Sequence, residues 1–79
     1  MKFYGYPSDA DLSQPLSLSE VSFFGSEESL REIARFLVRC ADEIANTPAA
    51  EGVELHFHLR EYSKLNEFES DLVVVPRSK

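Results

Sequence analysis

One stretch of the chain, residues 27–46, has the spacing of an amphipathic helix, whereas the segments around it alternate as strands do. Gly25 breaks the preceding segment, and Ser26 is a good N-cap because its hydroxyl can accept a free backbone N–H of the first turn. Two glutamates follow, where the helix dipole favours carboxylates. The apolar residues then recur every three or four positions, as Leu30, Ile33, Ala34, Leu37, Ala41 and Ile44. We expect this stripe to be the buried face of a helix that ends at Asn46-Thr47-Pro48.

Four other segments are predicted to be strands. The clearest is 53–60, where Val53, Leu55, Phe57 and Leu59 alternate with Glu54, His56, His58 and Arg60. The others are 2–6, 16–24 and 71–76. Segment 16–24 needs a bulge near Ser19-Glu20 to bring its apolar residues to one face. Segment 71–76 is apolar on both faces. Residues 7–15 are predicted to be a loop, and residues 61–70 a loop or a short helical turn.

A chain of 79 residues allows a single domain, 1–79. The order strand-strand-helix-strand-strand predicts an α+β fold, in which a mostly antiparallel sheet of about four strands carries the helix on one face. The second face then needs a cover, because it would present aromatic and β-branched side chains: Tyr4, Tyr6, Phe24, Val73 and Val75. Either the two loops wrap over it, with Leu12, Tyr62, Leu65 and Phe68 as the plug, or a second copy covers it. We expect a homodimer that pairs through this face, since exposed apolar patches usually mark interaction surfaces.

The charge balance excludes some kinds of partner. Fourteen acidic against eight basic side chains give a net charge of −6, which argues against nucleic-acid binding and favours a basic protein partner. No apolar run approaches the roughly 18 residues of a membrane helix, and the N-terminus lacks the pattern of a secretory signal. The single cysteine, Cys40, cannot form an internal disulfide, so a cytoplasmic protein is expected.

The residues with catalytic or metal-binding chemistry are few. Glu54, His56 and His58 share one strand face and could bind zinc or iron, which leaves a small metal-binding protein or enzyme as an alternative. An open strand lacks a fourth rigid ligand, so we expect no metal, no cofactor and no catalytic residue. Mid-helix Cys40 is interpreted as a buried, inert thiol. The ridge of Arg31, Arg35 and Arg39 is interpreted as a face paired with neighbouring carboxylates, such as Glu28 with Arg31.

The polar residues of 54–69 are the predicted partner-binding surface: Glu54, His56, His58, Arg60, Glu61, Glu67 and Glu69. Residues 51–71 hold six carboxylates against two basic side chains. We expect this acidic surface to dock a basic partner.

Several segments together resemble the immunity protein 32 family of bacterial polymorphic toxin systems. They are the stretch from Leu18 to Phe23, the helix with its Gly25-Ser26 turn, Lys2-Phe3-Tyr4-Gly5-Tyr6, His56-Phe57-His58-Leu59-Arg60-Glu61-Tyr62 and Asp71-Leu72-Val73-Val74-Val75. The resemblance implies a small α+β protein that binds and neutralises a cognate toxin in the cytosol. A structural homodimer without a toxin partner is the other alternative.

Overall fold

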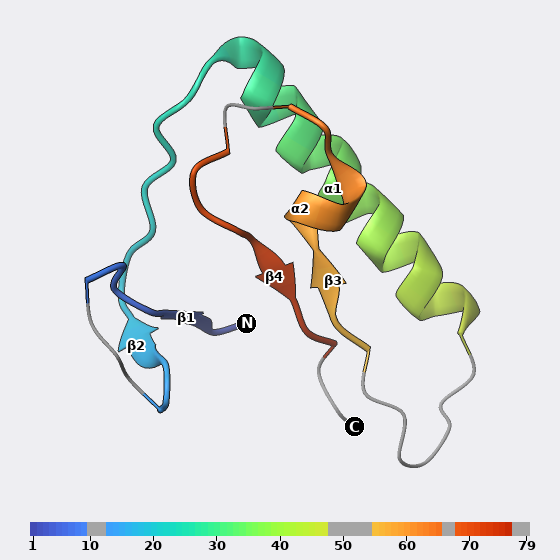
Figure 1. Ribbon diagram of the computed structural model, residues 1–79. Coiled ribbons are helices and arrows are strands. Elements are labelled where there is room, and N and C mark those ends of the chain that lie inside the picture. Colours follow the sequence, from blue (N-terminus) through green and yellow to red (C-terminus); the bar gives the residue numbers. More distant parts are fainter. Residues whose placement is uncertain (10–12, 48–54, 66–67, 77–79) are drawn as a thin grey trace.

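The computed structural model describes residues 1–9, 13–47, 55–65 and 68–76 (Figure 1). Its elements are β1 (Phe3–Gly5), β2 (Leu16–Leu18), α1 (Glu27–Asn46), β3 (Phe57–His58), α2 (Leu59–Tyr62) and β4 (Val73–Val74). The strands form two separate antiparallel pairs, β1–β2 and β3–β4. The α+β class is therefore confirmed, whereas the single sheet of about four strands is wrong. Within the described residues, no helix is both long and apolar enough to cross a membrane.

Helix α1 has the predicted bounds, and its ends are stabilised by short polar contacts. Ser26 Oγ accepts a hydrogen bond from the Ser29 backbone N–H at 3.1 Å, and the Leu30 N–H donates to the Ser26 carbonyl at 3.0 Å. At the other end, Thr47 Oγ1 donates to the Glu43 carbonyl at 2.6 Å. The two side-chain contacts, from Ser26 and from Thr47, pair backbone groups that a helix terminus leaves unsatisfied.

The buried face of α1 is not centred where the apolar spacing predicts. Phe36 and Cys40 are 3% exposed, while Leu30 and Leu37 are each 44% exposed. Ile33 packs against the core, so the predicted stripe is only partly correct. The apolar arc of the helix is wide, and the rest of the chain packs on the side that carries the large Phe36 ring, which buries the most apolar area there.

The core lies between α1 and the unit formed by β3, α2 and β4. Phe36, Cys40 and Leu59 are its buried members, and the partly buried residues packed around them are Ile33, Phe57, Tyr62, Phe68, Leu72 and Val74. The rings of Phe36 and Tyr62 are tilted, with centroids 5.6 Å apart. Tyr62 and Phe68, two of the expected plug residues, thus pack on this core, and Leu65 is partly buried. Leu12, the fourth, lies outside the described residues.

The predicted strand 53–60 is much shorter in the structure, because the chain turns into a helix at Leu59. The Leu59 N–H still donates to the Leu72 carbonyl at 2.9 Å, as in a ladder. The next amide, that of Arg60, donates instead to a side-chain oxygen of Asp71 at 3.2 Å. A side-chain acceptor thus replaces the ladder carbonyl at this point, and β3 ends. Residues 53–54 lie outside the described residues, and β4 covers only the middle of the predicted strand 71–76.

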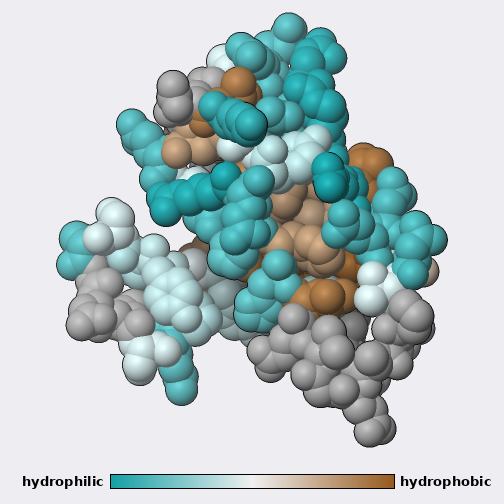
Figure 2. Space-filling view, turned by 45° about the vertical axis from the view of Figure 1, so that its right-hand side comes forward, coloured by the Kyte–Doolittle hydropathy of each residue, from teal (hydrophilic) through white to brown (hydrophobic). Residues whose placement is uncertain are grey.

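The hairpin β1–β2 projects away from the helix (Figures 1 and 2). Phe3 pairs with Leu18 and Gly5 with Leu16. A Cβ at Gly5 would lie 3.0 Å from Leu18 Cδ1, so glycine at this position leaves room for the Leu18 side chain. The predicted strand 16–24 ends at Leu18, and residues 21–26 run without strand pairing toward α1. They form no ladder with β3 or β4, which is why two small sheets replace one larger sheet.

Candidate functional site

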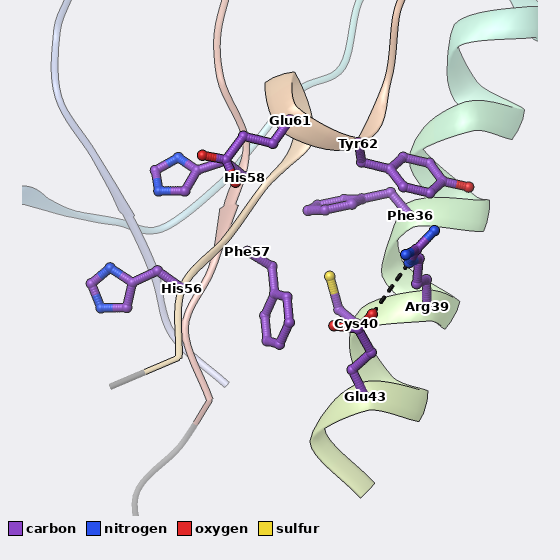
Figure 3. Close-up of a pocket in the computed structure, with 9 residues that line it drawn as sticks. All are labelled: Phe36, Arg39, Cys40, Glu43, His56, Phe57, His58, Glu61 and Tyr62. Atoms are coloured by element: carbon purple, nitrogen blue, oxygen red, sulfur yellow. Dashed lines mark hydrogen bonds and ion pairs between the residues drawn. The ribbon is translucent and has the colours of Figure 1, made fainter. Parts of the chain in front are cut away.

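An open hollow of about 240 Å³ lies between α1 and the β3–α2 segment (Figure 3). Its apolar lining consists of Phe36, Cys40, Phe57 and Tyr62, and its polar lining of Arg39, Glu43, His56, His58 and Glu61. Figure 2 shows apolar surface bordered by hydrophilic residues on the face that it presents. Three of the predicted partner-binding residues therefore line one hollow: His56, His58 and Glu61.

The charges of α1 are paired along the helix. Arg31 lies 3.6 Å from Glu27, Arg35 lies 3.4 Å from Glu32, and Arg39 lies 3.3 Å from Glu43, each measured from Nε to a carboxylate oxygen. The interpretation of the arginine ridge as a charge-paired face is confirmed, although Arg31 uses Glu27 instead of Glu28. In the hollow, the Arg39 guanidinium also lies 5.5 Å from the centre of the Tyr62 ring, a cation–π distance.

The histidines point away from α1, whereas Phe57 between them points toward it (Figure 3). This confirms the predicted alternation at residues 56–58. His58 Nδ1 lies 2.7 Å from Asp71 Oδ2, so one ring nitrogen of His58 is already engaged. Glu54, the third member of the predicted metal triplet, lies outside the described residues. In the part of the chain that the structure describes, no three His, Cys, Asp or Glu side chains are grouped to bind a metal ion.

Asp71 is a residue of this region that the sequence did not single out. Burial raises the pKa of its carboxyl group, but the hydrogen bonds from His58 and from the Arg60 amide more than compensate, so the net pKa is lowered. The Arg60 side chain is held nearby, since Nη2 donates to the Glu69 carbonyl at 3.2 Å. No sequence signal marks Asp71, because His58 lies 13 residues away and only folding brings them together.

Cys40 lies on the buried side of the hollow and is 3% exposed. Its pKa is raised, chiefly by burial and then by the nearby Glu43 carboxylate. A raised pKa keeps the thiol protonated near neutral pH, and a protonated thiol is a poor nucleophile. The predicted burial of Cys40 is therefore confirmed, and the inertness of its thiol stays a prediction.

The remaining predicted residues are spread over the surface. Arg60 and Glu69 are exposed but do not line this hollow, and Glu67 lies outside the described residues. The residues expected at a dimer face are also exposed: Tyr4 by 55%, Tyr6 by 61%, Phe24 by 96%, Val73 by 43% and Val75 by 60%. They belong to the separate hairpin, the segment before α1 and the β4 region, and not to one sheet face.

Comparison with known proteins gave one match. The family model described as immunity protein 32 matches residues 20–77, which include α1, α2, β3 and β4 and exclude the hairpin β1–β2. No curated protein and no solved structure matches the chain.

Proposed function

Because the chain belongs to the immunity protein 32 family, we propose that it binds a cognate bacterial toxin in the cytoplasm and blocks the toxin's active cleft. Membership of the family implies an immunity protein that neutralises such a toxin. In the proposed mechanism, the protein does no chemistry of its own and acts only by occupying the cleft. The family match over residues 20–77 is the observation that carries this proposal.

The hollow between α1 and β3–α2 is the toxin-binding surface we propose. Its aromatic lining, Phe36 and Tyr62, can hold the alkyl stem of a lysine or arginine from the toxin. The Glu61 carboxylate at the same hollow can then meet the charged end of that side chain. Glu43 is already paired with Arg39, which makes Glu61 the carboxylate we assign to the toxin.

The charge of the chain supports a basic cleft as the target. A net charge of −6 attracts a basic surface and accelerates encounter. Toxins that cut nucleic acids need such a surface, since affinity for the phosphate backbone comes mainly from lysine and arginine. An acidic protein seated in that cleft would exclude the nucleic acid from it.

Co-expression with a candidate toxin domain, chosen from the genes that flank the gene for this chain, tests the proposal. Bacteria that express the toxin domain alone should stop growing, and the intact 79-residue protein should restore growth. A Glu61→Lys variant should restore growth less well, whereas Glu20→Lys, the same charge change at an exposed site on the segment before α1, should act as the wild type does. Failure of the wild-type protein to restore growth or to bind the purified toxin domain would overturn the proposal.

A further inference from the structure

Helix α1 carries more apolar surface than its own chain covers. Its core-facing side includes Ser29, Ile33, Phe36 and Cys40. One residue further along the helix from each of these lie Leu30, Ala34, Leu37 and Ala41, and all four are exposed. Both leucines are 44% exposed, and Val38 beside them is 62% exposed. We call Leu30, Ala34, Leu37 and Ala41 the outer stripe.

We propose that the outer stripe pairs with the same stripe of a second copy, in an antiparallel contact between two α1 helices. The spacing of its residues is four, three and four, which is the heptad spacing of helices that pack side by side. In the antiparallel arrangement, Leu30 lies opposite the partner's Ala41, and Leu37 lies opposite the partner's Ala34. Every layer then joins one large and one small side chain, so the stripe is complementary to itself.

The charges beside the outer stripe fit the same arrangement. At 100° per residue, Arg31 and Asp42 lie within about 20° of each other around the helix axis, on the same flank of the stripe. In an antiparallel pair, residues on the same flank of the two helices face each other. The alignment that sets Leu30 against the partner's Ala41 also brings Arg31, an exposed side chain 3.6 Å from Glu27 of its own helix, within about two residues of the partner's Asp42. The twofold symmetry makes this ion pair twice, which favours a second copy as the occupant despite the net charge of −6 on each chain.

This surface is separate from the proposed toxin site. Phe36, Arg39 and Glu43 line the hollow, and the heptad geometry places them on the side of α1 away from the outer stripe. A dimer formed through the outer stripe would therefore leave the hollow open, and each copy could bind a toxin. The inference does not depend on the proposed function, since self-association needs no toxin.

Sedimentation equilibrium of the intact protein, at concentrations from about 1 to 100 µM, tests the proposal. We expect the mass to rise from 9.0 kDa toward twice that value as the concentration increases. Ala34→Glu should raise the dissociation constant at least tenfold, because it places a carboxylate between the two helices. Glutamate is a good helix former, and circular dichroism should show the helix of this variant intact.

A charge exchange makes the test specific for the antiparallel pair. Arg31→Asp and Asp42→Arg should each weaken the dimer severalfold, since each change sets like charges against each other. The double variant should restore the wild-type dissociation constant. A protein that stays at 9.0 kDa throughout would overturn the proposal. So would a dimer that tolerates Ala34→Glu but is lost in the Tyr4→Ser/Tyr6→Ser variant, because the hairpin would then be the interface.

Discussion

His58 Nδ1 lies 2.7 Å from Asp71 Oδ2, and the other carboxylate oxygen of Asp71 accepts the Arg60 amide at 3.2 Å. The Asp71 side chain, just before β4, therefore binds both His58, the last residue of β3, and Arg60 in the first turn of α2. The N-cap residue of α2, His58, makes no side-chain hydrogen bond to the helix amides. Asp71 supplies that contact from another segment, so it acts as an N-cap that is remote in sequence.

Asp71→Ala should lower the free energy of unfolding by about 1–2 kcal/mol near neutral pH, because it removes two hydrogen bonds to a partly buried carboxylate. Urea unfolding followed by circular dichroism measures the change. Glu69→Ala is the matched control, since Arg60 contacts only the backbone carbonyl of Glu69. An equal loss in both variants would contradict the assigned role.

The same carboxylate should make stability depend on pH. The pKa of Asp71 is lower in the folded protein than its ordinary value of 3.8, so the folded state favours the ionised form. The stabilisation is then fully present above the ordinary pKa and is lost as the pH falls through the lowered value. The difference between wild type and Asp71→Ala should therefore be constant above about pH 5 and shrink as the pH falls from about 4 to about 2. A difference that stays constant over this range would exclude Asp71 as its source.

Leu59→Ala should destabilise the protein by about 2–5 kcal/mol, because Leu59 is the largest fully buried side chain among the described residues, at 1% exposure, and its loss leaves a cavity. A small core has little stability in reserve, so we expect partial unfolding at 37 °C. Val75→Ala, at a 60% exposed site, should change the free energy of unfolding by less than about 0.5 kcal/mol. Thermal unfolding of the three proteins would measure both effects.

Association with the toxin should be fast at low salt and slow markedly as salt rises, because salt screens the attraction between exposed charges. Reversing Glu61, Glu67 and Glu69 to lysine should lower the on-rate further. Stopped-flow or surface-binding kinetics would measure both changes. An on-rate insensitive to salt and to the reversals would mean that these carboxylates only keep the protein in solution.

Purified protein should hold no stoichiometric zinc, iron or manganese. One ring nitrogen of His58 is already engaged by Asp71, and among the described residues no three His, Cys, Asp or Glu side chains are grouped to bind a metal ion. Elemental analysis of protein purified without chelators is the measurement. About one metal ion per chain that disappears in the His56→Ala variant would instead support the metal-binding alternative.

Local chemistry made α1 predictable and left its burial partly open. The Ser26 cap, the acidic first turn and the helical spacing all act within a few residues of one another, so they could be recognised in the sequence. Which part of the wide apolar arc of α1 is buried depends on the part of the chain that packs against it. Phe36 and Cys40 are buried because Leu59 and its neighbours pack against them, and that contact spans about twenty residues.

The strands and the hollow were less predictable because their limits are set by tertiary contacts. Alternation correctly placed Phe57 opposite the two histidines. It could not show that the Asp71 side chain would end β3 after His58. For the same reason, His56, His58 and Glu61 could be proposed as surface residues, whereas the presence of the Phe36 and Tyr62 rings at the same hollow could not.

The remote cap has a consequence for the cooperativity of the fold. A helix of four residues, Leu59–Tyr62, is too short to persist in isolation, and its first turn is held by Asp71. A fluctuation that detaches β4 from β3 must therefore also melt α2 and uncover Leu59. Hydrogen exchange should consequently show the Leu59 and Arg60 amides opening in the same event, with one free energy for the whole β3–α2–β4 unit.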